Sequence, residues 1–237
     1  LEEYGSIARQ VFRSAGIPFF IDEKHSIMMN PFIEYLRAAM EMAVQGFSYE
    51  SVFRYLRCGM SDITREEADL LENYVIALGI RGVNRWKEKW VRIYRGMEPE
   101  TIEKLNEIRE KFVEETEILR DCFSGKKRTV LEYCQGLYAF IVKSKIQEKL
   151  KVQEEVFQQN GDKAMEKEYA QIYGIVMDLL DKAAEILGEE TATPEELRQI
   201  LEIGMTQAKV ALIPPSIDQV LVGDMERTRL KDIRALF

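Results

Sequence analysis

Residues 218–237, DQVLVGDMERTRLKDIRALF, are the part of the sequence that decides the fold. Residues 219–222 predict a buried strand, residues 226–229 predict a polar turn, and a second strand begins at Arg234 and stops at Phe237. A strand needs a neighbour because its backbone N–H and C=O groups pair across a sheet. Little else in the chain could supply that sheet, so this end indicates an excised piece of a larger protein.

Composition indicates a soluble globular protein of one large or two small domains. The chain has 237 residues, of which 46% are hydrophobic and 31% are charged. It contains no run of about 18 apolar residues, so no membrane span is expected. The net charge of −8 excludes a chain that coats itself on DNA but permits a local basic patch. Three widely spaced cysteines argue against a disulfide framework or a metal site and favour reduced thiols in the cytoplasm.

Helical periodicity dominates the middle of the chain, between two short strands. A helix over residues 2–15 precedes a strand over residues 17–21, and residues 30–212 predict only helices and turns. Asn30 before Pro31 is an N-cap, and residues 64–67 and 193–196 are capping boxes. The helices expected in this block span residues 31–43, 48–57, 64–79, 86–94, 99–123, 128–159, 162–187 and 193–211.

The predicted order is a strand, a helical block and then strands again. This order indicates that the helical block is inserted into a domain that contains a sheet. We therefore predict a mainly α fold, in which a helical insertion domain is flanked by short strands that belong to a small α/β domain. The predicted boundaries assign residues 1–22 to the entry into that domain, residues 23–212 to the insertion, and residues 213–237 to the return. The two ends should then share one sheet, because an isolated short strand has little stability.

The sequence resembles the AddB or RexB family, which supplies one of the two subunits of the bacterial ATP-dependent helicase/nuclease. The resemblance is carried by GIPFFIDEKHSIMMNPFIE at residues 16–34, YESVFRYLR at 49–57, LENYVIALGIRG at 71–82 and VLVGDMERTR at 220–229. Residues 100–210 match by helical character alone. In UvrD-like helicases a helical insert of this kind, called the 2B subdomain, interrupts the second motor domain, called 2A. The resemblance thus implies a 2B-type insertion with remnants of a 2A-type domain at both ends.

This resemblance implies a subunit that processes DNA double-strand breaks for recombinational repair. Its partners would be DNA and the helicase/nuclease A subunit, and its role would be to shape the DNA channel and to dock the partner. It also implies ATP, Mg²⁺ and an iron–sulfur cluster in the parent complex. No cofactor and no small-molecule substrate are expected in this fragment, because it lacks a phosphate loop and carries GDMERTR where active helicases have a motif that couples ATP to DNA. We expect it to be inactive alone, without catalytic or metal-ligating residues.

Residues 81–95, RGVNRWKEKWVRIYR, form the first candidate site. They hold six basic residues and one acidic residue. On a helix over 86–94, Arg85, Lys89 and Arg92 would form a phosphate-facing stripe, with Arg81 nearby, while the two tryptophans and Ile93 would share the opposite, apolar face. The alternative is a plain amphipathic helix with core tryptophans and solvated charges.

The turn at residues 226–229 is the second candidate. Arg227 and Arg229 would face nucleic acid, or would instead form a salt-bridge network that pins the return strand. His25 is the single histidine and is expected in a solvent-facing loop. Glutamates at 103, 107, 110 and 114 are expected on a solvated helix face.

Two other functions remain open from the sequence. The chain could be a stand-alone helical scaffold that binds another protein, or the insert of a catalytically active UvrD-like helicase.

Overall fold

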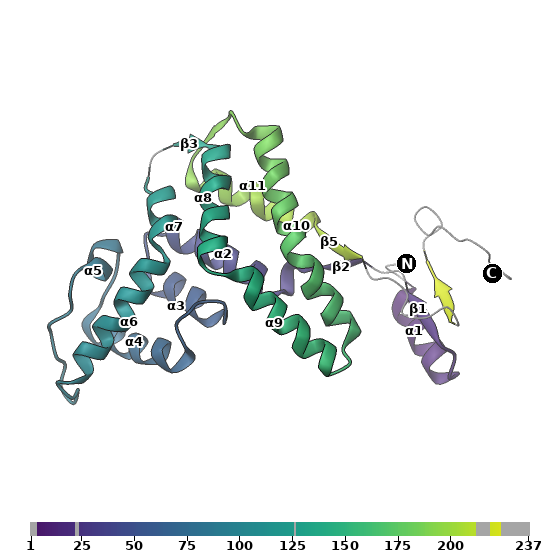
Figure 1. The fold of residues 1–237 in the computed structure, drawn as a ribbon, viewed down its shortest axis with the longest axis horizontal. Helices are drawn as coiled ribbons and strands as arrows, with labels where there is room; N and C mark the ends of the chain where they lie inside the picture. Colours follow the sequence, from purple (N-terminus) through teal and green to yellow (C-terminus); the bar gives the residue numbers. More distant parts are fainter. Residues whose placement is uncertain (1–3, 22–23, 126, 212–218, 224–237) are drawn as a thin grey trace. The chain divides into compact units, whose positions relative to one another are not determined.

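The protein is mainly α-helical, as predicted, and its chain divides into two compact units (Figure 1). One unit combines Leu1–Ser26 with Lys209–Phe237, and the other is Ile27–Ala208; we call them the terminal unit and the helical unit. The computed structural model describes residues 4–21, 24–125, 127–211 and 219–223. The predicted domain boundaries and the identification of the terminal unit as a motor-domain remnant stay predictions.

The terminal unit joins both ends of the chain through short strands. Strand β1 (Phe19–Ile21) pairs in parallel with β6 (Val220–Val222), with Phe19 opposite Val220. Strand β2 (Lys24–Ser26) pairs antiparallel with β5 (Lys209–Ala211). The expectation that the two ends share a sheet is therefore confirmed for these strands. His25 lies in β2, so its predicted loop position is wrong.

Helix α1 (Gly5–Ser14) packs on the first strand through one aromatic contact. The rings of Phe12 and Phe19 lie 5.5 Å apart. Ile7 and Val11, one helical turn apart on α1, are 58% and 55% exposed. Residues 224–237, which include the predicted second strand, lie outside the described residues.

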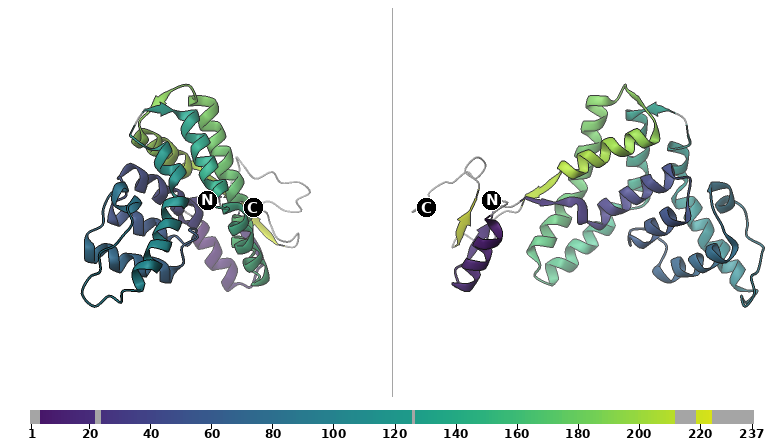
Figure 2. Two further views of the ribbon diagram at one scale, coloured as in Figure 1. Left: turned by 60° about the vertical axis from the view of Figure 1, so that its left-hand side comes forward. Right: turned by 180° about the vertical axis from the view of Figure 1, so that it is seen from behind.

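The helical unit is built from helices that pack against one another, the longest of those described being α10, and Figure 2 shows it from two further sides. Its helices, in chain order, are η1 (Ile27–Met29), α2 (Pro31–Val44), α3 (Tyr49–Arg57), α4 (Arg65–Leu78), α5 (Val83–Lys87), α6 (Thr101–Glu115), α7 (Glu117–Cys122), α8 (Val130–Lys143), α9 (Ile146–Gln159), α10 (Lys163–Leu187) and α11 (Pro194–Gln207). Helices α9 and α10 form an antiparallel hairpin, and α2 lies at the centre, with eight of its residues buried.

The predicted helix starts are confirmed by their capping hydrogen bonds. The Asn30 side chain accepts from the Phe32 N–H, with Pro31 at the first helical position. Both predicted capping boxes, at residues 64–67 and 193–196, have their two reciprocal bonds. Because each bond joins residues at most three apart, the local sequence is sufficient to specify it.

Two predicted long helices are each broken once. The helix expected over 99–123 is interrupted at Thr116, whose hydroxyl donates to the Phe112 carbonyl at 2.7 Å. The helix expected over 128–159 is interrupted at Ser144 and at Lys145, which has a φ of 51°. Ser144 is buried, and its hydroxyl lies within hydrogen-bond distance of the Tyr35 hydroxyl, at 3.2 Å, so a contact from α2 reaches the second break.

Short strands also occur where only helices and turns were predicted. Strand β3 (Arg128–Thr129) pairs antiparallel with β4 (Thr191–Ala192). Helix α11 ends at Gln207 rather than at residue 211, because the chain continues into β5. Among the described residues, no helix combines the length and the apolar character needed to cross a membrane.

Candidate nucleic-acid interface

The segment of residues 81–95 is a pinned loop, and the helix predicted over residues 86–94 is wrong. Helix α5 has five residues and ends at Lys87, and Glu88 already has an extended backbone. No helix or strand follows until α6 begins at Thr101. Arg85, Lys89 and Arg92 therefore do not form a stripe on one helical face.

The side chains of α6 replace the hydrogen bonds that a longer helix would have made. Asn106 accepts from the Trp90 N–H at 2.9 Å and donates to the Trp90 carbonyl at 2.8 Å. Arg109 donates to the Trp86 carbonyl at 2.9 Å and to the Lys87 carbonyl at 3.4 Å. Buried backbone groups need partners, and these contacts supply them without regular secondary structure.

Both tryptophans belong to the core, as the alternative interpretation of this segment predicted. Trp86 is 2% exposed and lies 4.6 Å from Phe112, measured between ring centroids. Trp90 is 5% exposed and stacks on Tyr74 at 4.7 Å. Ile93, which was expected on the same apolar face, is 49% exposed. The two tryptophans thus anchor residues 86–90 to the core of the helical unit.

All six basic side chains of the segment are exposed. We call them the basic platform: Arg81, Arg85, Lys87, Lys89, Arg92 and Arg95. Arg85 pairs with Glu88 at 3.3 Å, and both side chains are more than half exposed. Such a pair contributes little, so it does not hold Arg85 away from another anion. The arrangement is a set of solvated cations on a fixed support, which is chemically suited to binding phosphates.

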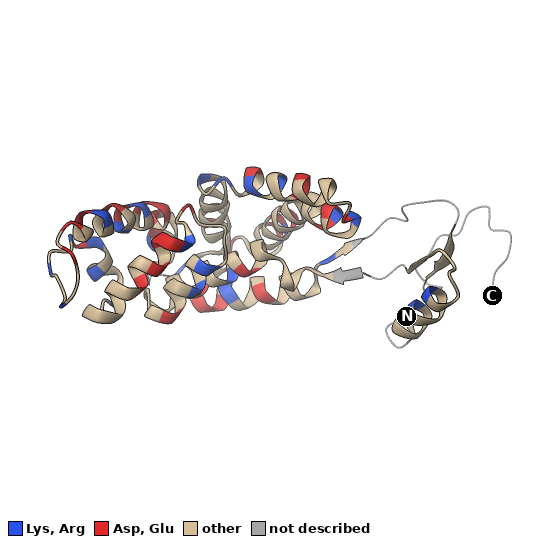
Figure 3. Ribbon diagram, turned by 90° about the horizontal axis from the view of Figure 1, so that it is seen from below, with Lys and Arg blue, Asp and Glu red and all other residues tan. Residues whose placement is uncertain are grey.

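The surroundings of the basic platform are acidic or mixed. Glu103, Glu107, Glu110 and Glu114 are exposed on α6, which confirms the predicted solvated face. Elsewhere on the helical unit, basic and acidic residues are interleaved along the helices (Figure 3). In this part of the helical unit the excess of positive charge therefore lies in residues 81–95, beside an acidic face of α6. Arg227 and Arg229, the other predicted contacts, lie outside the described residues.

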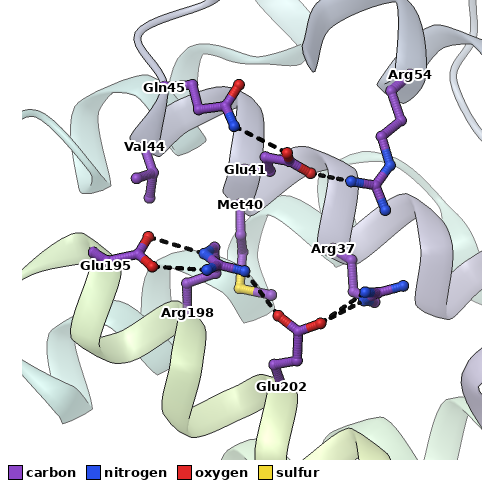
Figure 4. Close-up of a pocket in the computed structure, with 9 residues that line it drawn as sticks. All are labelled: Arg37, Met40, Glu41, Val44, Gln45, Arg54, Glu195, Arg198 and Glu202. Carbon is purple, nitrogen blue, oxygen red and sulfur yellow. Dashed lines mark hydrogen bonds and ion pairs between the residues drawn. The ribbon is translucent and has the colours of Figure 1, made fainter. Parts of the chain in front are cut away.

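A polar hollow of about 300 Å³ lies between α2, α3 and α11 (Figure 4). Arg198 pairs with Glu195 and Glu202, each at 2.7 Å, and Arg37 pairs with Glu202 at 2.7 Å. The Arg37 hydrogen bond is the main cause of the lowered pKa of Glu202. Arg54 contacts Glu41 on the opposite side. Each of these arginines already has a carboxylate partner, so the hollow is an ion-pair network that ties three helices together.

A second polar cluster is buried between α2, α3 and α6. Glu115 accepts from the hydroxyls of Tyr35 and Tyr55, and also from the Ser61 hydroxyl at 2.9 Å. Burial raises the pKa of both tyrosines well above the ordinary value. At neutral pH both hydroxyls therefore keep their protons and can donate to Glu115, and we interpret the cluster as a structural network.

The described residues do not fit an iron–sulfur cluster or another metal site. Burial raises the pKa of Cys58 to about 12 and those of Cys122 and Cys134 to about 11, which opposes the thiolate form that metals bind. No group of three histidine, cysteine or carboxylate side chains gathers within the part of the chain that the structure describes.

Asn106 and Arg109 are the residues that sequence reasoning missed. They lie one position beyond Leu105 and Ile108 of the apolar stripe on α6, yet both are buried. Polar residues beside an apolar stripe usually lie at the edge of the buried face and are partly exposed. Their position in the sequence is therefore only weak evidence that Asn106 and Arg109 are buried.

Comparison with known proteins finds relatives that match the whole chain. The sequence is 45% identical over 240 residues to a protein of Lachnoclostridium phytofermentans, 39% over 246 residues to one of Caldanaerobacter subterraneus, and 39% over 237 residues to one of Clostridium novyi. Each of these relatives is named as the B subunit of an ATP-dependent helicase/deoxyribonuclease. Every match covers 100% of this chain but only 20–21% of the relative. No model of a protein family matches the sequence.

Proposed function

The chain belongs to the B-subunit family of the ATP-dependent helicase/deoxyribonucleases, and it spans about a fifth of the length of its relatives (21%). From this premise we propose that it is a non-catalytic, DNA-binding part of such a subunit. In this proposal the whole protein acts in DNA repair together with a partner subunit, and any ATP, Mg²⁺ or iron–sulfur chemistry belongs to other parts of the complex. The chain's own task is to hold duplex DNA and to dock the partner.

The observation that carries the DNA-binding role is the basic platform. Its six cations are exposed, and four of them (Arg85, Lys87, Lys89 and Arg92) lie within two residues of backbone positions that side chains of α6 hold beside two buried tryptophans. Cations on a fixed support lose little conformational freedom when they bind, so more of their attraction for phosphates becomes affinity. Contacts of this kind read the DNA backbone and not its sequence.

The non-catalytic role is supported by the chemistry of the remaining polar sites. The arginines of the hollow are paired with carboxylates, and the buried tyrosines keep their protons at neutral pH. The sequence also has no phosphate loop to hold ATP.

The test is a salt titration of duplex DNA binding with the chain in which Arg85, Lys89 and Arg92 are replaced by alanine. Each lost phosphate contact should make the slope of log affinity against log salt shallower by about 0.9. Three contacts then correspond to a change of about 2.7 in slope, and to about a hundredfold weaker binding near 0.15 M salt.

A matched variant controls for net charge. Lys151, Lys163 and Lys182 are exposed on α9 and α10, and their replacement by alanine removes the same three charges elsewhere. The control should bind DNA with nearly the original slope. Equal slopes for both variants and the original chain would sink the proposal and would favour a helical scaffold that binds another protein.

A further inference from the structure

Helix α6 carries a buried arginine directly beneath the basic platform. Arg109 is 3% exposed, and its guanidinium contacts the loop backbone and Asn106 rather than solvent. We propose that Arg109 and Asn106 are positioning residues: by binding the loop backbone they hold the side chains of the basic platform where they can bind the phosphates of DNA. We call these two residues the clamp. This inference rests on the proposed function, but it concerns residues that would never touch the nucleic acid.

Arg109 holds the carboxyl end of helix α5. Its Nη1 donates to the carbonyls of Trp86 and Lys87, at 2.9 Å and 3.4 Å. The last carbonyls of a helix have no partner within the helix, and they carry partial negative charge that favours a cation. A cation at this position therefore stabilises the end of helix α5 at Lys87, after which the backbone becomes extended at Glu88.

Asn106 holds the next part of the loop and is itself held by Arg109. It makes two hydrogen bonds with the backbone of Trp90, and its Oδ1 also accepts from Arg109 Nε at 3.1 Å. The two clamp residues thus contact the backbone at positions 86, 87 and 90. Arg85, Lys87, Lys89 and Arg92 all lie within two residues of these positions, so a shift of the clamp moves most of the platform.

The guanidinium is required for its shape and not only for its charge. Its separate nitrogens reach the loop carbonyls, Asn106 and, through Nη2, the carboxylate of Glu110 at 2.8 Å. A lysine has one ammonium on a flexible stem and cannot make this planar set of contacts. The Glu110 partner also offsets the charge of Arg109, so Arg109 adds little to the positive field at the surface.

Direct DNA contact and positioning predict different results for Arg109→Lys. If only charge mattered, the lysine variant would behave like the original chain. If the fork of hydrogen bonds positions the loop, Arg109→Lys should resemble Arg109→Met. In both variants we expect duplex DNA binding to lose the equivalent of at least one phosphate contact, a slope shallower by about 0.9 and an affinity about fivefold weaker near 0.15 M salt.

Tryptophan fluorescence reports on the clamp independently of DNA. The chain has two tryptophans, Trp86 in helix α5 and Trp90 in the loop that follows, and the clamp binds the backbone of both. Arg109→Lys, Arg109→Met and Asn106→Leu should each shift the emission to longer wavelength and increase quenching by acrylamide, while far-UV circular dichroism keeps its helical signal. Arg120→Met is the matched control, because Arg120 is a largely buried arginine on α7, beyond the clamped loop.

The outcomes separate the clamp from the proposed function. Unchanged emission and an unchanged salt slope in Arg109→Lys would overturn the clamp. If Arg109→Met does not fold, Arg109→Lys and Asn106→Leu decide the question by the same two readouts. If the original chain shows no salt-dependent binding, the proposed function fails, and the emission of the three variants alone decides whether these residues hold the loop.

Discussion

Replacing Trp90 tests whether the loop of the basic platform is part of the core. Trp90 is 5% exposed, stacks on Tyr74 with ring centroids 4.7 Å apart, and donates its indole N–H to the Arg85 carbonyl at 2.9 Å. Trp90→Ala removes the packing and the hydrogen bond together. Large-to-small changes of a buried tryptophan destabilise proteins by about 3–5 kcal/mol, so we expect a loss in that range.

Trp90→Phe separates the two contributions. The phenyl ring can keep the stacking on Tyr74 but cannot donate to the Arg85 carbonyl. Loss of one hydrogen bond costs about 1 kcal/mol, and up to about 3 kcal/mol if the carbonyl is left buried without a partner. We therefore expect Trp90→Phe to be clearly less destabilising than Trp90→Ala.

The assay is urea unfolding followed by far-UV circular dichroism, which reports mainly on the helical unit and does not depend on the replaced fluorophore. The Arg85, Lys89 and Arg92 triple variant is the comparison, and it should unfold almost like the original chain because its charges are exposed. A loss below about 1 kcal/mol for Trp90→Ala would refute the reasoning, since it would mean that the loop does not pack as described. A destabilised triple variant would instead place those charges in an internal network.

Two further predictions concern the interior of the helical unit. Asn30→Ala should lower the free energy of unfolding by about 2–5 kcal/mol, because the Asn30 side chain caps α2 and also donates to Glu168 at 2.7 Å. Asn30→Ser keeps the cap alone and should recover part of that loss in the same urea assay; equal losses would show that the cap contributes nothing. Burial is the main cause of the raised pKa values of Tyr35 and Tyr55. Above the ordinary tyrosine pKa of about 10, only the unfolded state therefore loses these protons. The contribution of the two tyrosines to the free energy of unfolding should be fully present below that pH and should fall as the pH rises above it. Unfolding measured between pH 8 and about 11 should show a steeper decline in the original chain than in the Tyr35→Phe, Tyr55→Phe double variant, and parallel curves would contradict the assignment.

The sequence alone determined the features whose causes are local. The caps at Asn30, Thr64 and Thr193 are confirmed, because each is a hydrogen bond between residues at most three apart. The pairing of β1 with β6 joins residues about two hundred positions apart, yet it was predictable, since short apolar strands at both ends need a sheet partner. The resemblance to the B-subunit family was likewise visible in the sequence, in short motifs within residues 16–82 and at residues 220–229.

For the candidate site, the sequence predicted the residue types but not their arrangement. The two buried tryptophans and the exposed cations of residues 81–95 follow from composition and spacing. The end of α5 at Lys87 does not, because it depends on Asn106 and Arg109, which lie 16 and 23 positions from the groups they bind.

The tertiary structure also decided where the long helices break. The sequence around Ser144 and Lys145 contains no glycine or proline, so helical periodicity continues through it. The break places Ser144 against the Tyr35 hydroxyl, 109 positions away. Local propensities are weak compared with the free energy of satisfying buried polar groups, so distant partners determine the backbone wherever such groups meet in the core.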